Sequence, residues 1–452
     1  MLKRYTLPPM AELWTRRETK FEYWLKAELA FLHARIEIAD LTIDAYEAIS
    51  NHAQIDVARI DRIDNEIQHD LIAFVTDAQE SLVEAGVGQY KEEFHKLLTS
   101  YDVEDPALIL MLRRAIELII TELQNLKAAL WVKAQEHKWT LVIADTHGQD
   151  AEPSTFGALL LVYMEAVERA IARLQQVLDS ELGEGKMSGA VGNYAGMSFD
   201  LERRALAHLG LKPARAETQI LQRDRHAMLL SVLAVTAGTI EQMCRTFWER
   251  MQSRMRELEE PRTKKQKGSS AMAHKKNSII TEREQGASRL VRGYALAELE
   301  CIATPGWRDI SQSIVERVAL ADATTLVHYM VVKATDIVGG MTVFTERMRH
   351  NLDEASLGVW AGQQVRNALM EAGVDYETAY RYVQKTSFEA VQLGQHVSLL
   401  FGTEKISDTD ARTASDILGD AGLKKCFDAE AYIHDGIEYM FKLQKEKEGE
   451  PA

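Results

Sequence analysis

The sequence predicts an all-α protein with three helical regions, the central one a bundle of long helices. Glycine and proline are sparse for 452 residues, at 26 and 8, which favours long uninterrupted helices over a β structure with many turns. Apolar residues recur at helical spacing, and we find no convincing set of strands. The stretch 217–260 is apolar on more than one face, so we expect other subunits to complete the bundle. A large core within one chain is the alternative.

Length and composition bound the class of protein. At 452 residues the chain is too long for one simple core, and we expect domains at residues 1–105, 106–351 and 352–452. A net charge of −15 disfavours general binding to nucleic acid or anionic membranes. The three cysteines are widely spaced and fit neither a disulfide framework nor a zinc site. With no apolar signal-peptide core at the N-terminus, we expect buried thiols in a cytoplasmic protein.

The first region contains helices of moderate length. Apolar residues at helical spacing predict an amphipathic helix over 21–36 and a second helix over 55–78, with His69 and Asp70 inside it. The residues 99–102 break the pattern and predict a loop. Pro106 then opens the next helix at a first-turn position, where a missing N–H costs least.

The second region carries the longest apolar patterns, which predict helices over residues 107–137, 156–182 and 217–260. From residue 352 onward, glycines interrupt the pattern at short intervals. We therefore expect shorter helices in the third region.

The stretch 261–281 carries six basic residues and no acidic one in a strongly acidic protein. Serine and asparagine compete with the helix backbone for hydrogen bonds, so we expect a loop, able to close over an anion. A solvated basic linker is the simpler interpretation of this stretch taken alone.

Residues 268–277 of this loop read Gly-Ser-Ser-Ala-Met-Ala-His-Lys-Lys-Asn. This string resembles the Gly-Ser-Ser-x-Met-Pro-x-Lys-x-Asn signature of the aspartase/fumarase superfamily, and it is most similar to the adenylosuccinate lyase family. Ala273 and Ser278 stand where that family usually has prolines. Their presence implies a loop that is more flexible when open.

A second motif spans residues 145–157, where His147 lies between Thr146 and Gly148. We expect this histidine to be exposed in a loop ahead of a helix, although a lone histidine is usually structural. The segment resembles the Thr-His-Gly-Gln-x-Ala-Glu-Pro-x-Thr-x-Gly string of the same family. There the histidine protonates the leaving nitrogen, a role that suits an imidazole near neutral pH.

A third motif spans residues 307–317 and contains two arginines and a serine. Ser313 and Arg317 are one helical turn apart, and together with Arg308 they suit a phosphate group. Taken alone, the arginines would be surface salt-bridge partners. The segment is similar to the nucleotide 5′-phosphate site of the family, with Gln312 in place of the usual histidine.

Further segments match the family in chain order, each weak alone. They are Arg4-Tyr5, Gln68-His69-Asp70 with glutamine in place of arginine, Thr99-Ser100, residues 186–195, and Thr218-Gln219 followed by residues 223–226. For His69 and Asp70 a surface contact on a helix is the alternative, and residues 186–195 also suit a purely structural role.

The resemblance implies β-elimination of fumarate from a succinylated nucleotide, with no metal or other cofactor. It implies Ser269 as the base and His147 as the acid. It also implies a homotetramer in which several subunits build each active site. The implied substrate contacts are Arg4, Tyr5, Gln68, His69, Asp70, Thr99, Ser100, Thr146, Gln219, Ser270, Lys275, Lys276, Asn277, Arg308, Ser313 and Arg317.

Two alternatives stay open. Another lyase or cycloisomerase of the superfamily would act on a different succinylated or muconate-like substrate, without needing the phosphate-binding arginines. A non-catalytic structural homologue would keep only the helical bundle. The departures at Gln68, Asp145, Ala273 and Ser278 give this second alternative some weight.

Overall fold

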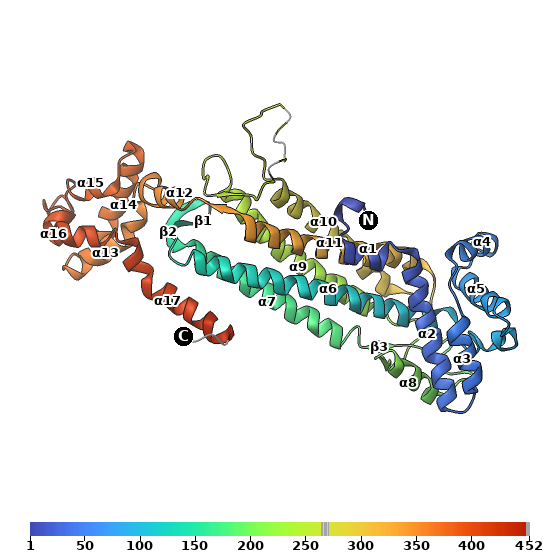
Figure 1. Cartoon of the computed structure of the whole chain (residues 1–452). Helices are drawn as coiled ribbons and strands as arrows, with labels where there is room; N and C mark the ends of the chain where they lie inside the picture. The colour runs from blue at the N-terminus through green and yellow to red at the C-terminus, as the bar shows by residue number, and fades with distance from the viewer. Residues whose placement is uncertain (264, 266–268, 270, 449–452) are drawn as a thin grey trace. The chain divides into compact units, whose positions relative to one another are not determined.

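The computed structural model describes residues 1–263, 265, 269 and 271–448. Helices dominate these residues, which confirms the predicted all-α class (Figure 1). The strands among them form three small two-stranded sheets, which the sequence analysis missed. Four of these strands have two residues each, and the two longer strands, Leu141–Thr146 and Gln149–Thr155, do not alternate between buried and exposed residues.

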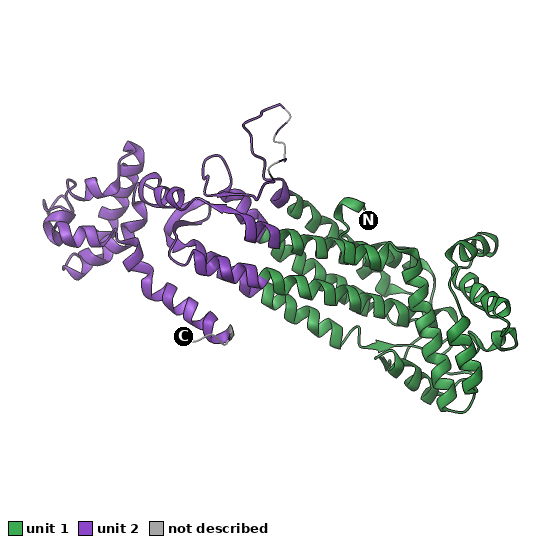
Figure 2. Ribbon diagram, viewed as in Figure 1, with its two compact units in different colours: residues 1–126, 167–242, 283–334 green, residues 127–166, 243–282, 335–452 purple. Residues whose placement is uncertain are grey.

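The chain divides into two compact units, each built from three separate stretches (Figure 2). Unit 1 contains residues 1–126, 167–242 and 283–334, and unit 2 contains residues 127–166, 243–282 and 335–452. The predicted boundaries near 105 and 351 divide the chain by sequence pattern and stay a prediction.

Unit 1 begins with short helices around an aromatic core. Phe21 and Trp24 of α2 pack edge to face at 5.4 Å, and both contact Phe74 of α5. The elements of this part are η1 Lys3–Tyr5, α1 Pro8–Trp14, α2 Arg17–Glu37, α3 Ile43–His52, α4 Val57–Ile67, α5 Asp70–Glu84 and η2 Gly88–Glu93.

The helix predicted over residues 55–78 was wrong, because the chain breaks between α4 and α5. Gln68 ends α4 in the left-handed region at φ 57°. His69 caps α5, and its Nδ1 accepts a hydrogen bond from the Ile72 N–H at 3.4 Å. The apolar period continues across this break, so it cannot reveal it.

The loop predicted at residues 99–102 was also wrong, because α6 runs from Ser100 to Glu136 with Pro106 inside it. The carboxylate of Asp102 accepts a hydrogen bond from the Thr99 N–H at 2.9 Å, as in a capping box. This contact starts the helix two turns before the proline.

The long helices are α6 Ser100–Glu136, α7 Phe156–Asp179, α9 Asp224–Arg250, α10 Ile279–Glu300 and α11 Ser311–Gly340. The prediction over 217–260 was too long at both ends, because residues 217–223 are irregular and Leu258–Glu259 forms strand β5. By length and composition α9 could cross a membrane, but half of its apolar window is buried inside the protein, as in a core helix.

Unit 1 is completed by α8 Phe199–His208, strands β3 Glu184–Gly185 and β4 Lys212–Pro213, and η3 Cys301–Ala303. Cys301 in unit 1 and Cys244 and Cys426 in unit 2 are buried thiols outside any disulfide, as the sequence analysis expected.

Unit 2 contains a β-hairpin and the short helices predicted after residue 352. Strands β1 Leu141–Thr146 and β2 Gln149–Thr155 pair antiparallel, and β5 pairs with β6 Thr342–Val343. The helices are α12 Thr345–His350, η4 Asn351–Ala355, η5 Val359–Ala361, α13 Gly362–Glu371, α14 Tyr376–Leu393, α15 Val397–Phe401, α16 Ala414–Lys425 and α17 Ala429–Glu448.

Candidate active site

Unit 1 gathers seven of the predicted substrate contacts around one pocket of about 810 Å³. The N-terminal ends of α5, α6 and α11 and the segment before α11 supply them. These residues are Gln68, His69, Asp70, Ser100, Arg308, Ser313 and Arg317. Neither Arg4, Tyr5, Thr99 nor Gln219 lines this pocket.

Arg317 is held at the pocket by acidic side chains. Its NH2 lies 2.9 Å from Asp70 Oδ2 and 3.8 Å from Glu104 Oε2. Lys20 donates a second hydrogen bond to Asp70 Oδ2 at 2.7 Å. Burial opposes ionisation of Asp70, but Lys20 and Arg317 outweigh it and lower the pKa of this carboxyl. The guanidinium is therefore fixed in direction while about half of its side chain stays exposed.

Arg308 is held by two other contacts. Its guanidinium carbon lies 3.9 Å from the centre of the Tyr101 ring, and its NH1 donates to Gln219 Oε1 at 2.8 Å. Its Nε is buried and has no hydrogen-bond partner among the described residues. Gln219 thus does not line the pocket itself but binds Arg308, which does.

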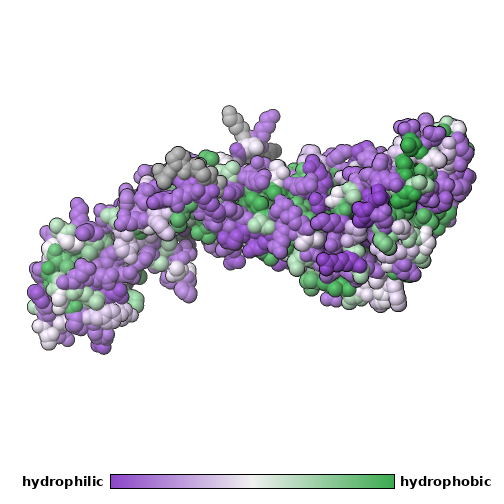
Figure 3. Space-filling view, turned by 90° about the horizontal axis from the view of Figure 1, so that it is seen from below, coloured by the Kyte–Doolittle hydropathy of each residue, from purple (hydrophilic) through white to green (hydrophobic). Residues whose placement is uncertain are grey.

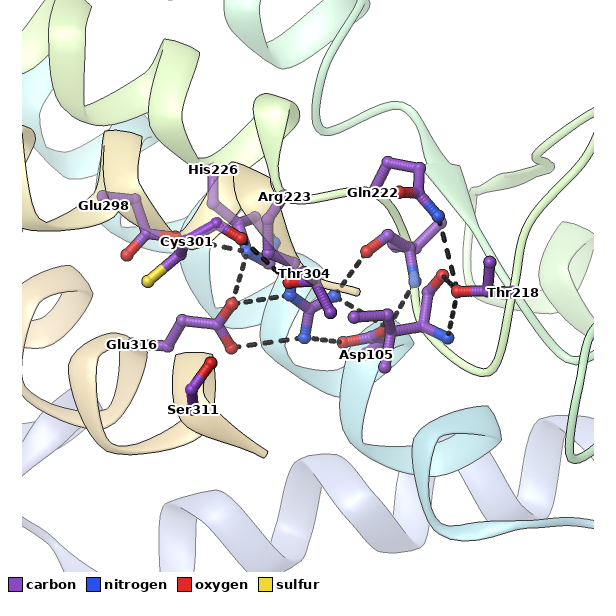
Figure 4. Close-up of polar contacts among 12 residues, drawn as sticks. Asp105, Thr218, Gln222, Arg223, His226, Glu298, Cys301, Thr304, Ser311 and Glu316 are labelled. Atoms are coloured by element: carbon purple, nitrogen blue, oxygen red, sulfur yellow. Dashed lines mark hydrogen bonds and ion pairs between the residues drawn. The ribbon is translucent and has the colours of Figure 1, made fainter. Parts of the chain in front are cut away.

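A buried polar network lies beside this pocket. Arg223 sits between two carboxylates, with its Nε 2.5 Å from Glu316 Oε1 and its NH2 3.0 Å from Asp105 Oδ1 (Figure 4). His226 Nδ1 is 3.6 Å from Glu316 Oε1. Burial raises the pKa of the neighbouring Glu298 to about 7. The network joins α6, α9 and α11 and so fixes the helix that carries Ser313 and Arg317.

Arg4 and Tyr5 lie at the N-terminus, in η1. The Tyr5 ring packs edge to face on Tyr329 of α11 at 5.5 Å. Arg283 donates to the Tyr329 hydroxyl at 3.1 Å. Arg4 is exposed. Thr99 uses its backbone N–H to start α6, as described above.

Unit 2 carries the two predicted catalytic residues. His147 and Gly148 form the two-residue turn between β1 and β2, with φ of 55° and 71°. Both angles are positive, which is the requirement of a type I′ turn. His147 and Thr146 are exposed at this tip, as expected of the motif, although a hairpin replaces the predicted loop.

The signature loop also belongs to unit 2. The Ser269 Oγ accepts a hydrogen bond from the Met272 N–H at 3.2 Å. Lys276 donates to both carboxylate oxygens of Glu259, at 2.8 and 2.7 Å. Lys276 and Asn277 line a small pocket of about 70 Å³, and Lys275 is exposed. The predicted contact Ser270 lies outside the described residues.

Comparison with known proteins gives one consistent result. A family model described as lyase matches residues 6–293. The chain is 40% identical to adenylosuccinate lyase of Thermotoga maritima, over 88% of this chain and 90% of that protein. It is 38% identical to adenylosuccinate lyase of Synechocystis, over 98% and 100% of the two chains. The chain belongs to the adenylosuccinate lyase family.

A solved structure of the same fold is a fumarate lyase from Mesorhizobium. It superposes with a TM-score of 0.86 over 97% of this chain and 98% of that one, at 22% identity. At this identity the match supports the fold alone, and it agrees with the aspartase/fumarase-like architecture that the motifs predict.

Tyr101 and Glu104 also line this pocket, and the family motifs did not predict them as substrate contacts. Tyr101 directly follows the Thr99-Ser100 segment, and its contact with Arg308 joins distant parts of the chain. Glu104 lies one helical turn after Ser100, a spacing that places both on one face of α6. That spacing was the available signal.

Proposed function

We propose that the protein is an adenylosuccinate lyase, which eliminates fumarate from adenylosuccinate to give AMP. The near full-length match to curated adenylosuccinate lyases carries this proposal. The gathering of Arg308, Ser313 and Arg317 at one pocket supports a phosphate-bearing substrate. The same chemistry extends to the succinylated aminoimidazole carboxamide ribotide of purine synthesis.

In the proposed reaction, Ser269 removes the proton next to a carboxylate and His147 protonates the departing nitrogen. A serine hydroxyl is a weak base unless its oxyanion is stabilised. The hydrogen bond from the Met272 N–H to the Ser269 Oγ supports such a role. Lys275 and Asn277 add donors for the carboxylate of the intermediate. Closure of the loop would exclude water and strengthen these contacts.

The assembly that we propose is a cytoplasmic homotetramer in which each active site draws residues from several subunits. Two observations support it. His147 is exposed at a hairpin tip. Apolar side chains also remain exposed on central helices, among them Met228, Val235, Leu290 and Leu296.

The test is fumarate release from adenylosuccinate, measured by absorbance, for the wild type and for Ser269→Ala and His147→Gln. We expect wild-type turnover and a loss of kcat of roughly 10²- to 10⁴-fold in each variant. Ser253→Ala, an exposed serine elsewhere in unit 2, is the matched control and should retain activity. A wild type that releases no fumarate would overturn the function. A Ser269→Ala variant with full activity would overturn only its role as the base.

A further inference from the structure

A cluster of two histidines and one glutamate lies on unit 1, in α2 and α8. His33 and Glu37 are four residues apart on α2, and His208 ends α8. His33 Nδ1 is 2.9 Å from His208 Nε2, which is 2.7 Å from Glu37 Oε1. The third side of the triangle, from His33 Nδ1 to Glu37 Oε1, is 3.5 Å.

One proton on His208 Nε2 can reach both Glu37 Oε1 and His33 Nδ1 only by sharing itself in a three-centre hydrogen bond. A neutral imidazole nitrogen carries either a hydrogen or a lone pair, so His208 Nε2 either donates to Glu37 or accepts from His33. In the first case the His208 N–H already donates to Glu37, so a hydrogen on His33 Nδ1 would face another hydrogen, and this nitrogen has to present its lone pair. Three lone pairs that converge on one point are the arrangement that a cation satisfies.

The triangle also has the dimensions of a metal site. Divalent zinc binds histidine nitrogen and carboxylate oxygen at about 2.1 Å. Two such ligands are about 3.0 Å apart at a right angle and about 3.4 Å apart at the tetrahedral angle. The three measured separations, from 2.7 to 3.5 Å, lie close to this range.

The surrounding residues hold the ligands in place. Arg204 donates to the other oxygen, Glu37 Oε2, at 2.8 Å, which leaves Oε1 directed at the histidines. Arg204 is itself held by Asp200 at 2.8 Å. The Tyr46 ring packs edge to face on His33 at 5.3 Å.

We propose that His33, Glu37 and His208 form a binding site for a divalent transition-metal ion such as Zn²⁺. Two imidazoles and one carboxylate suit this class of ion and leave further positions for water. The three side chains are partly exposed, so the ion can enter from solvent. Bound there, it would tie α8 to α2. The site is separate from the residues of the proposed lyase reaction.

A second His–carboxylate cluster in the described residues, formed by His226, Glu298 and Glu316, makes a useful contrast. Its Glu316 oxygen is already engaged by the guanidinium of Arg223 at 2.5 Å. In that cluster the positive charge of Arg223 already occupies the carboxylate oxygen that faces His226. At Glu37, by contrast, Arg204 binds Oε2 and leaves Oε1 to the histidines.

The test is calorimetric titration of Zn²⁺ into full-length protein that has been stripped with EDTA and dialysed. We expect one ion per chain at the site and a rise in the melting temperature on Zn²⁺ addition. Visible absorption of the Co²⁺-loaded protein would report nitrogen and oxygen coordination. His208→Ala and Glu37→Gln should each weaken Zn²⁺ binding by roughly tenfold or more.

His434→Gln, which alters an exposed histidine in unit 2, is the matched control and should bind Zn²⁺ as the wild type does. His33→Gln serves as a third variant if His208→Ala does not fold. A wild type with no stoichiometric Zn²⁺ binding would overturn the proposal. Folded His208→Ala and Glu37→Gln proteins that both keep wild-type affinity would do the same.

Discussion

At the residue scale, Tyr101 contacts two guanidinium groups at this pocket. Its ring supports the guanidinium of Arg308 at 3.9 Å and lies 5.7 Å from that of Arg223. Burial raises the pKa of its hydroxyl to about 12, so the ring stays neutral at physiological pH. A neutral aromatic ring attracts a cation that lies over its face but, unlike a carboxylate, does not neutralise the positive charge. Tyr101 can therefore orient Arg308 and leave its charge available to a phosphate.

We predict that Tyr101→Leu raises KM for adenylosuccinate and leaves kcat nearly unchanged. Cation–π contacts contribute about 0.5 to 2 kcal/mol, which corresponds to roughly a 2- to 30-fold change in KM. The phosphate end of the substrate is remote from the bond that breaks. We therefore expect the substitution to weaken substrate binding and to leave the chemical step unchanged. Steady-state fumarate release is the measurement.

Tyr101→Phe is the matched variant for this prediction, because it keeps the ring and removes only the hydroxyl. It should behave as the wild type. If Leu and Phe give the same KM while circular dichroism shows both folded, the stack has no role in binding.

The motif residues of this pocket could be predicted because their types and their spacing can be recognised within one short stretch of sequence. Arg308, Ser313 and Arg317 stand within ten positions of each other, and the structure places all three at one pocket. The contact of Tyr101 with Arg308 could not be predicted in this way. It depends on the packing of α6 against the segment before α11, and no local pattern records that contact.

At the element scale, the break between α4 and α5 shows the limit of periodicity. Ile60 and Ile63 before the break and Leu71 and Phe74 after it are all buried, so the apolar pattern runs through residue 68. The left-handed Gln68 and the capping His69 interrupt the backbone without interrupting that pattern. The break turns the start of α5 toward the pocket, which explains how Gln68, His69 and Asp70 come to line it.

Three helices bring charges together at that point. Asp70 begins α5, Glu104 lies in the second turn of α6, and Arg317 lies on α11. Burial, and then the charge of Asp70, raise the pKa of Glu104 from its ordinary 4.5 to about 7. Between these two values the folded protein holds a proton that the unfolded chain has released. Stability therefore falls as the pH rises through this window and levels off above it.

We predict that Glu104→Gln stabilises the protein at pH 8 and has much less effect at pH 5. The shift sets an upper bound of roughly 3 kcal/mol for the gain at pH 8. The measurement is the melting temperature at both pH values and one protein concentration. Glu117→Gln, an exposed position on the same helix, is the control and should show no such difference. An equal effect of Glu104→Gln at both pH values would contradict a raised pKa.

At the scale of the whole molecule, one chain leaves apolar surface on its central helices. Met228 and Val235 are seven residues apart on α9, on one face, and are 50% and 52% exposed. Hydrophobic surface also remains among hydrophilic side chains on the face drawn in Figure 3. The sequence predicted that α9 would be covered on more than one side. On the opposite face Leu229, Leu233 and Ile240 are buried within the chain, so the exposed stripe is the part that we propose another subunit covers.

We predict that Val235→Glu lowers the molecular mass of the particle in solution and reduces fumarate release in parallel. A carboxylate buried in an apolar interface without a partner costs several kcal/mol, which opposes association of the subunits. Light scattering coupled to size exclusion, with activity assayed on the same fractions, is the measurement. Val391→Glu makes the same chemical change at an exposed site on α14, 58% exposed, and should leave both mass and activity unchanged. A Val235→Glu protein with the mass of the wild type would remove this stripe from the interface. A monomeric wild type with full turnover would show that each chain builds a complete active site by itself.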